Sequence, residues 1–376
     1  MSLAPASKAN EQASIDARYM ALALTLGRRG LGRTWPNPAV GAVIVKNGLI
    51  VGRGWTQPGG RPHAEIEALR RAGPAARGAT LYVTLEPCSH YGKSPPCADA
   101  VIAAGIARVV SALEDPNPEV AGAGHARLRG AGITVDVGLG AEQARRDHAG
   151  HIRRMRDGRP HVMLKLAASA DGKAGAAGRK PFAITGERTR ERVHLLRARS
   201  DAIMIGIGTA LADDPILTCR LPGMADCSPL RIVLDSSLRL PSRSRLARSA
   251  RQVPLWVIAG PEASAGAKEM LEIAGVTILA VQRADGRLDL GATLRLLAER
   301  GISRLMVEAG PILAAALLEA DLVDEVALFR SDKVVGRDSI DALEGIPLTA
   351  LSQSPHLASV QSEAVGEDSC EIFERR

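Results

Sequence analysis

The chain has 376 residues, of which 46% are hydrophobic, 24% are charged and only 2% are aromatic. A length of this order favours two domains, and the composition is that of a globular chain, not of a disordered or collagen-like one. No apolar run approaches the roughly 20 residues of a membrane helix. The amino end also lacks the charged and apolar regions of a signal peptide. We therefore expect a soluble, cytoplasmic protein.

The net charge of +7 comes from 48 Lys and Arg against 41 Asp and Glu. This excess suits either a polyanion or a small phosphorylated substrate, and the dispersal of the arginines favours the small phosphate. The scarcity of aromatic rings disfavours a surface that stacks single-stranded bases. An odd, sparse set of cysteines in a cytoplasmic chain indicates thiols or metal ligands, not disulfides. The cysteines are Cys88, Cys97, Cys219, Cys227 and Cys370.

The first part of the chain is predicted to alternate strands with short helices. Residues 1–13 show no apolar period and are predicted to be a loose end, whereas apolar residues recur at helical spacing from Ser14 to Gly30. Asn47-Gly48 between two apolar runs predicts a hairpin over 40–51. The further predicted elements are a helix at 63–71, a strand at 80–85, a helix at 97–104 and a strand at 107–112. This alternation is typical of α/β layers.

A polar, Arg-rich stretch at 141–159 is predicted to be a solvated helix followed by a linker, with a nucleic-acid-binding arm as the alternative. The boundary is placed near residue 155, which gives domains 1–155 and 156–376. A second alternation of apolar runs follows at once. Its predicted strands are 161–167, 202–207, 231–235, 255–259, 276–281, 304–308 and 325–329, and its predicted helices are 187–199, 264–273, 291–300 and 311–320.

Three residues in the first part have the types and order of zinc ligands. His63 opens a predicted helix, and Cys88 and Cys97 follow in a Pro-rich loop. One imidazole and two thiolates leave the fourth tetrahedral position for water, as a catalytic zinc site requires. Glu65, two residues after His63, can take a proton from that water and deliver it to a leaving amine. This is the order of residues in zinc deaminases, except that eight residues, not two, separate the cysteines.

Each motif alone has a plainer interpretation. A His-x-Glu at a helix start is usually a polar helix surface, and two cysteines can be buried thiols. In combination and in order they favour a deaminase. Two other hypotheses stay open: a deaminase of nucleic acids, which needs aromatic stacking, and a structural zinc module, which needs four protein ligands.

Four segments resemble the amino-terminal domain of the bifunctional riboflavin-biosynthesis deaminase/reductase family: 36–41, 62–65, 84–97 and 115–122. The long loop between the cysteines is typical of that family. The resemblance implies a cytidine-deaminase-like α/β/α sandwich with one zinc ion bound by His63, Cys88 and Cys97, and with Glu65 as proton shuttle. It also implies that Asn37 and His90 line the pyrimidine pocket and that Lys93 reaches the substrate phosphate. The alternatives are turn chemistry for Asn37 and an ordinary solvated loop for the other two.

Two glycine-containing turns stand out in the second part. Gly206-Ile207-Gly208-Thr209 and Glu308-Ala309-Gly310-Pro311 each follow a predicted apolar strand. Glycine there lets main-chain amides at a helix amino end approach a pyrophosphate. Neither turn matches Gly-x-Gly-x-x-Gly, so each alone also fits a plain strand–helix connection.

The order of four segments, 164–173, 208–215, 231–236 and 307–316, resembles the carboxy-terminal reductase of the same family, an α/β domain similar to dihydrofolate reductase. With the first domain, the resemblance covers most of residues 15–330 and is thin after about 345. The implied NADPH contacts are Ala167, Thr209, Asp213, Ser236, Gly310, Pro311, Ile312, Leu313, Ala314, Ala315 and Ala316. The implied substrate contacts are Arg197, Leu217, Arg220 and Glu308, with Lys165 as a catalytic or positioning residue. Arginine suits a phosphate monoester through its planar donor fork.

One segment departs from this resemblance. Where the family often has Ser-Gly-Glu-Ser-x-Trp, residues 178–183 read Gly-Arg-Lys-Pro-Phe-Ala. Pro181 and Ala183 supply neither the hydroxyl nor the ring, so either Arg179, Lys180 or Phe182 replaces them or the reductase is less efficient. We interpret the difference as a lineage variant.

The resemblance thus implies one chain with two successive activities. The first hydrolyses the 2-amino group of 2,5-diamino-6-ribosylamino-4(3H)-pyrimidinone 5′-phosphate, and the second uses NADPH to reduce the ribosyl group to ribityl. The expected partner is this small phosphorylated pyrimidine, with no nucleic acid and no membrane, in a homo-oligomer.

Overall fold

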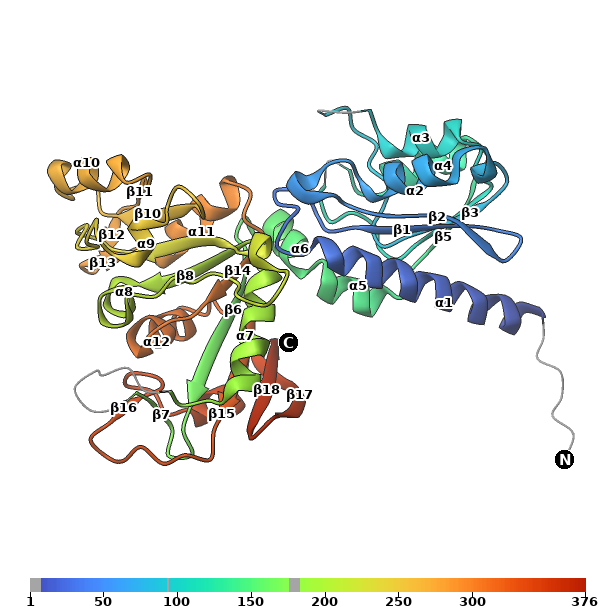
Figure 1. Cartoon of the computed structure of the whole chain (residues 1–376). Helices are drawn as coiled ribbons and strands as arrows, with labels where there is room; N and C mark the ends of the chain where they lie inside the picture. The colour runs from blue at the N-terminus through green and yellow to red at the C-terminus, as the bar shows by residue number, and fades with distance from the viewer. Residues whose placement is uncertain (1–7, 93–94, 119, 176–182) are drawn as a thin grey trace, which may run out of the picture. The chain divides into compact units, whose positions relative to one another are not determined.

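The computed structural model describes residues 8–92, 95–118, 120–175 and 183–376. The chain divides into two compact units, Met1–Gly158 and Arg159–Arg376, and each has its own main sheet (Figure 1). Among the described residues, no helix combines the length and the apolarity that a bilayer crossing needs.

The first unit is built on a five-stranded sheet with the strand order β2-β1-β3-β4-β5. Its strands are β1 (Gly41–Lys46), β2 (Leu49–Trp55), β3 (Thr80–Val83), β4 (Arg108–Ser111) and β5 (Thr134–Val137). β1 pairs antiparallel with β2 and β3, whereas β3, β4 and β5 are parallel. Asn47 and Gly48, at φ 51° and 75°, form the hairpin turn that the dipeptide predicts.

Helices cover both faces of this sheet, as the predicted sandwich requires. They are α1 (Lys8–Gly27), α2 (Ala64–Ala72), α3 (Cys97–Ala103), α4 (Ala123–Gly130), α5 (Ala141–Asp147) and α6 (Ala149–Asp157). α2, α3 and α4 lie on one face, and α1 and α5 on the other (Figure 1). Glycines in β2 allow α2 to approach closely, because a Cβ at Gly52 would lie 2.3 Å from the Ala68 carbonyl oxygen and a Cβ at Gly54 2.3 Å from that of Ala64. This contact fixes the amino end of α2 against the sheet.

Two predictions for this unit were wrong. Residues 8–13 are helical, not loose, because α1 begins at Lys8, where good helix formers precede the apolar stripe. Residues 141–157 form the two helices α5 and α6, and Gly158, at φ 63°, makes the connection to the next strand. Ala144 and His148 are buried, and Nε2 of His148 lies 3.1 Å from Oγ1 of Thr84. Arg145, Arg146 and Arg156 are exposed, so the polar composition alone suggested a linker.

The second unit has a nine-stranded sheet with the order β11-β10-β9-β8-β14-β6-β15-β18-β17. Its strands are β6 (His161–Ala168), β8 (Ala202–Gly206), β9 (Leu230–Leu234), β10 (Leu255–Ala259), β11 (Thr277–Ala280), β14 (Arg304–Val307), β15 (Glu325–Arg330), β17 (Leu357–Val365) and β18 (Asp368–Arg375). The first seven strands in this order, from β11 at the edge to β15, are parallel to one another. The hairpin of β17 and β18 follows, with β18 antiparallel to β15. The seven predicted strands are all present, and the tail after 345 completes the sheet.

The helices and the short strands of this unit connect the sheet strands. They are β7 (Lys173–Gly175), α7 (Glu187–Ala198), α8 (Ile207–Asp213), α9 (Arg245–Arg248), α10 (Ala265–Ile273), β12 (Arg283–Ala284), β13 (Arg287–Leu288), α11 (Leu290–Glu299), α12 (Pro311–Glu319), β16 (Ile340–Asp341) and α13 (Thr349–Ser352). α8 begins where β8 ends, and α12 begins shortly after β14 ends. Since β8 and β14 are neighbours, both helix starts lie at the carboxyl edge of the sheet, where α/β proteins bind ligands.

Candidate active sites

Three side chains converge at one end of α2 in the first unit. His63 immediately precedes α2, Cys88 lies in the loop after β3, and Cys97 is the first residue of α3. Nδ1 of His63 lies 3.7 Å from Sγ of Cys88 and 3.3 Å from Sγ of Cys97. Around a tetrahedral zinc ion, neighbouring S and N ligand atoms are roughly 3.6 Å apart, from metal–ligand distances of about 2.3 and 2.0 Å. The spacing therefore fits zinc.

The chemistry of these donors also fits a catalytic zinc ion. The hydrogen bond from the thiol of Cys97 holds the pKa of the Cys88 thiol well below its usual range and so favours the thiolate, the form that binds metals. Nε2 of His63 is buried and has no hydrogen-bond partner among the described residues, whereas Nδ1 faces the sulfurs. Within the described residues no fourth His, Cys, Asp or Glu joins this group. Three protein donors are the number that catalytic zinc sites use.

Glu65 lies beside these donors without joining them. It is in the first turn of α2, and its side chain is only 3% exposed. Burial raises the pKa of its carboxyl to about 7. A carboxyl that titrates near neutrality can both accept and release a proton, which general acid–base catalysis requires.

The predicted pyrimidine-binding residues lie on two loops. Nδ2 of Asn37 donates a hydrogen bond to the carbonyl oxygen of Gly60 at 2.8 Å, which ties its loop to the segment that leads into His63. His90 is exposed. A Cβ at Gly92 would lie 3.8 Å from the ring of His90 and 3.7 Å from the guanidinium of Arg61, so both side chains lie against the same loop. Lys93 lies outside the described residues.

In the second unit, an ion pair joins residues far apart in sequence. Nε and Nη2 of Arg197, on α7, donate to the two carboxylate oxygens of Glu308 at 2.5 and 2.8 Å. Nη1 of Arg197 also donates to the carbonyl oxygen of Thr218 at 3.2 Å, which holds the 216–220 segment next to the pair. Leu217, at φ 59°, is buried in this segment with a backbone conformation that bulky residues rarely adopt.

Further cations surround this pair. Burial lowers the pKa of Lys165, on β6, while Glu308 supports its charged form. Burial opposes ionisation of Glu308, but the charge and hydrogen bonds of Arg197 outweigh it and lower the pKa of Glu308. Burial and the charges of Arg197 and Arg220 lower the pKa of His194. The structure thus brings the predicted Lys165, Arg197, Arg220 and Glu308 into one basic cluster, which suits a phosphate monoester.

The predicted cofactor residues gather at the adjacent edge of the sheet. A Cβ at Gly310 would lie 3.1 Å from Oγ1 of Thr209, and a Cβ at Gly206 would lie 3.8 Å from Leu313, so the starts of α8 and α12 adjoin. Ser236 follows β9, the next strand in the sheet, and Ala167 lies on β6. Asp213 lies on α8 with an exposed side chain, and partial desolvation of its carboxyl raises its pKa. The side chains of Ala314 and Ala315 on α12 are buried.

Comparison with known proteins places both units in one family. The family model described as RibD C-terminal domain matches residues 160–370. The cytidine and deoxycytidylate deaminase zinc-binding region matches residues 13–113. Riboflavin biosynthesis protein RibD of Escherichia coli (strain K12) is 43% identical over 366 residues, which cover 94% of this chain and 98% of that protein. The chain belongs to the RibD family.

Solved structures similar to this chain support the RibD assignment over both units. Acinetobacter baumannii RibD, form 1, has a TM-score of 0.86 at 34% identity and covers 97% of this chain and 99% of its own. The diaminohydroxyphosphoribosylaminopyrimidine deaminase/5-amino-6-(5-phosphoribosylamino)uracil reductase of Thermotoga maritima has a TM-score of 0.83 at 33% identity and covers 97% and 100%. This confirms the predicted cytidine-deaminase-like and dihydrofolate-reductase-like folds. As a RibD-family member, the chain is a bifunctional deaminase and reductase of riboflavin biosynthesis.

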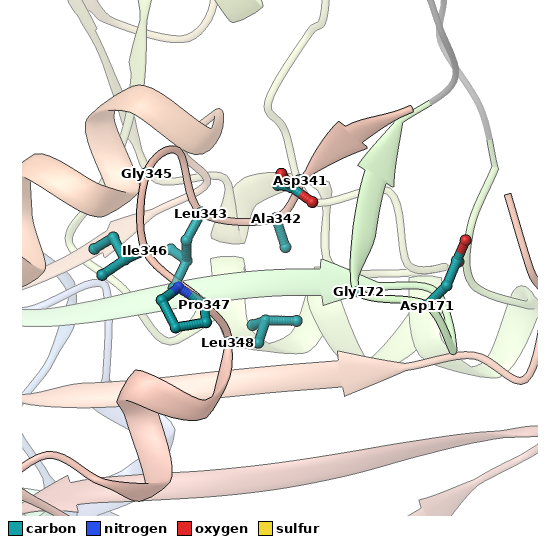
Figure 2. A pocket seen from close by; sticks show the side chains of 9 residues that line it. All are labelled: Asp171, Gly172, Asp341, Ala342, Leu343, Gly345, Ile346, Pro347 and Leu348. Atoms are coloured by element: carbon teal, nitrogen blue, oxygen red, sulfur yellow. The ribbon is translucent and has the colours of Figure 1, made fainter. Parts of the chain in front are cut away.

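A pocket of about 390 Å³ in the second unit of this RibD-family chain is lined by a different set of residues. It opens between the turn after β6, with Asp171 and Gly172, and the 341–348 segment (Figure 2). The carboxylate of Asp171 already accepts hydrogen bonds from Oγ of Ser169 and from the main-chain amides of Val335 and Gly336. None of the predicted substrate or cofactor residues lines the pocket.

Sequence reasoning missed two residues that the structure places at the sites of this RibD-family chain. His194 lies one helical turn before Arg197 on α7, and its Nδ1 accepts a hydrogen bond from the main-chain amide of Arg220 at 3.4 Å. The i, i+3 spacing from Arg197 was the sequence pattern that could have revealed it. Glu86, which precedes Cys88 by two residues, is the other, and no local pattern indicates its partners. The departing stretch 178–182 lies outside the described residues.

Proposed function

We propose that the first unit deaminates 2,5-diamino-6-ribosylamino-4(3H)-pyrimidinone 5′-phosphate at a site with one zinc ion. The observation that carries this proposal is the convergence of His63, Cys88 and Cys97 at zinc-ligand spacing beside the buried Glu65. Asn37 and His90 would orient the pyrimidine, and Lys93 would meet its phosphate.

The zinc ion, when bound, would supply Lewis-acid activation of a water molecule. Glu65 would hold the proton taken from that water and pass it to the leaving 2-amino group, so that ammonia departs and a carbonyl remains. Its burial raises the pKa of the carboxyl towards neutrality, which suits both halves of the transfer.

We propose that the second unit then reduces the ribosyl group of the deaminated compound to ribityl with NADPH, which gives 5-amino-6-(5-phosphoribitylamino)uracil. The start of α12 and Thr209 would hold the cofactor phosphates through main-chain amides and the hydroxyl. Arg197 and Arg220 would bind the substrate phosphate, Glu308 would accept from ribose hydroxyls, and Lys165 would position the reacting sugar. The basic cluster around the Arg197–Glu308 pair supports this assignment.

The test of both activities uses the intact chain with zinc, NADPH and the pyrimidine phosphate. Release of ammonia followed by NADPH oxidation is expected. Ammonia release from transfer RNA instead would favour a nucleic-acid deaminase, and bound zinc without ammonia from either substrate would favour a structural module. NADPH that is not oxidised when deaminated substrate is supplied would remove the reductase half of the proposal.

Cys88→Ser and Cys97→Ser are each expected to lose stoichiometric zinc. The hydroxyl of serine does not ionise at neutral pH and is a much poorer zinc ligand than a thiolate. Elemental analysis after dialysis measures the metal, and Cys219→Ser is the matched control, because Cys219 is a buried cysteine of the second unit. Full zinc occupancy in both ligand variants would remove these residues from the site.

Arg220→Ala is expected to raise the KM of the reductase for its phosphorylated substrate by roughly 10- to 100-fold, the worth of one charge-assisted hydrogen bond. Deamination by the same protein should be unchanged. Steady-state NADPH oxidation with deaminated substrate measures the effect. A KM equal to that of the parent would place the phosphate elsewhere.

A further inference from the structure

Glu86 is a buried carboxylate that the proposed chemistry does not use. It is 3% exposed and follows β3, two residues before Cys88. Its Oε1 accepts hydrogen bonds from the main-chain amides of Gly124 and His125 at 2.7 and 3.1 Å. Its Oε2 accepts from the amides of Asp115 and Gly122, each at 3.0 Å. One carboxylate thus accepts hydrogen bonds from the main-chain amides of Asp115, Gly122, Gly124 and His125.

These four hydrogen bonds indicate that Glu86 has a structural role and is not a metal ligand. Glu86, Glu114 and His125 have potential ligand atoms within 4.8 Å of one another, the arrangement of a possible second metal site. Both oxygens of Glu86 already accept two amide hydrogens each, however, so the carboxylate is committed to the main chain. Its role is to hold Asp115 and the 122–125 turn against the Glu86-Pro87-Cys88 strap.

Gly124 brings α4 onto this strap. A Cβ at Gly124 would lie 2.1 Å from the carbonyl oxygen of Pro87, the residue before Cys88. No real side chain tolerates that distance, and Gly124 has an ordinary helical conformation, so the requirement for glycine is one of space. The first turn of α4 therefore rests directly on the main chain that carries the Cys88 thiolate.

Arg127 extends the same contact to the other side of Cys88. Its Nη1 donates to the carbonyl oxygen of Ser89 at 3.3 Å, and its Nε pairs with the carboxylate of Asp99 at 2.6 Å. Asp99 lies in the first turn of α3, whose first residue is Cys97. α4 thus contacts the chain before Cys88, the chain after it and the helix that presents Cys97.

We propose that Glu86 and Gly124 are positioning residues of the zinc site. They fix the Pro87–Ser89 main chain so that Sγ of Cys88 stays within ligand distance of the metal held by His63 and Cys97. The long loop between the two cysteines requires such additional contacts, because eight intervening residues do not by themselves fix the position of one sulfur relative to the other. This inference rests on the proposed zinc function.

The test compares two Gly→Ala changes in one helix of the intact chain. Gly124→Ala forces the Pro87 carbonyl aside, whereas a Cβ at Gly130, the last residue of α4, meets nothing within 4 Å. Alanine is the better helix former at either position, so a purely local helix effect would stabilise both variants. Gly124→Ala is expected to weaken zinc binding by about 10- to 100-fold in chelator competition, as loss of an outer-shell support typically does. Gly130→Ala is expected to bind zinc as the parent does.

Glu86→Gln tests the carboxylate in a second way. An amide replaces one oxygen by an NH₂ donor, which then faces two main-chain donors. The variant should show the same loss of zinc affinity. Both the Gly124→Ala and the Glu86→Gln proteins, loaded with Co²⁺, should show an altered thiolate-to-cobalt absorption band, a readout that a mere loss of stability would not change. Reduction of deaminated substrate by the second unit reports that the rest of the chain is intact.

The outcomes separate this inference from the proposed function. A parent protein that binds no zinc would overturn the proposed function itself. A parent that binds zinc, with Gly124→Ala equal to Gly130→Ala in zinc affinity and in the cobalt spectrum, would overturn the inference alone. Unfolding of the first unit by Gly124→Ala and Glu86→Gln would also overturn it, because the contact would then be a condition of the fold and not of the metal site.

Discussion

Glu65→Gln is expected to bind zinc and to fold, but to deaminate about 10²- to 10⁴-fold more slowly than the parent, the usual contribution of a positioned acid–base group. The amide has nearly the same shape as the carboxyl, so the packing around the buried side chain is preserved. It cannot, however, accept a proton from water or return one to the amine. Ammonia release per bound zinc is the measurement, since it separates a slower reaction from a smaller amount of metal.

Glu67→Gln is the matched control for this experiment. Glu67 lies two residues further along α2, is also buried, and pairs with Arg70 and Arg71. The same chemical change there should leave deamination within a small factor of the parent rate. If Glu65→Gln releases ammonia as fast as Glu67→Gln, another group shuttles the proton.

The zinc donors and Glu65 could be found in the sequence because their chemistry is carried by rare residue types in a fixed order. His63, Cys88 and Cys97 lie at the ends of predicted elements, and the structure brings their ligand atoms together. Glu86 could not be found in this way, since its partners are main-chain amides 29 to 39 residues away. Every residue type except proline has a main-chain N–H, so a contact of this kind leaves no pattern in the sequence.

The second site shows the same limit at longer range. Arg197 and Glu308 are 111 residues apart, and nothing local in either segment indicates the bidentate pair that they form. Only the resemblance to a known reductase brought them together before the structure did. Most of the seven parallel strands were predictable because strands buried on both faces are continuous apolar runs, whereas the edge strand β11 is partly exposed. β17 was missed since most of its residues are exposed and its pattern is polar.

A fragment from Arg159 to Arg376 is expected to fold, bind NADPH and reduce deaminated substrate at the rate of the intact chain, while it releases no ammonia. The two compact units divide between Gly158 and Arg159. The second unit contains all nine strands of its sheet, including β6 near its start and β18 near its end. NADPH oxidation with deaminated substrate, in the absence of zinc, is the measurement. A fragment that folds but oxidises no NADPH would show that the reductase needs the first unit.

The first residue of that fragment matters, because Arg159 anchors the start of the sheet. Its guanidinium donates to both oxygens of Asp324 at 2.6 and 2.8 Å, and Asp324 also accepts from the amide of Val162 and pairs with Arg375 on the last strand. Arg159→Met in the fragment should lower the free energy of unfolding by about 1–3 kcal/mol, and not by more, since Arg375 keeps the buried carboxylate paired. Burial opposes ionisation of Asp324, but the hydrogen bonds and charge of Arg159, the charge of His161 and the amide of Val162 together outweigh it and lower the pKa of the carboxyl. The stabilisation is therefore present above the pKa of about 3.9 that Asp has in an unfolded chain, and is lost as the pH falls through the lower folded value. Urea unfolding of the fragment and of its Arg159→Met variant, at neutral and at acid pH, is the measurement. The difference in unfolding free energy between the two proteins should shrink on acidification. An equal difference at both pH values would mean that Arg159 stabilises the sheet by packing and not through Asp324.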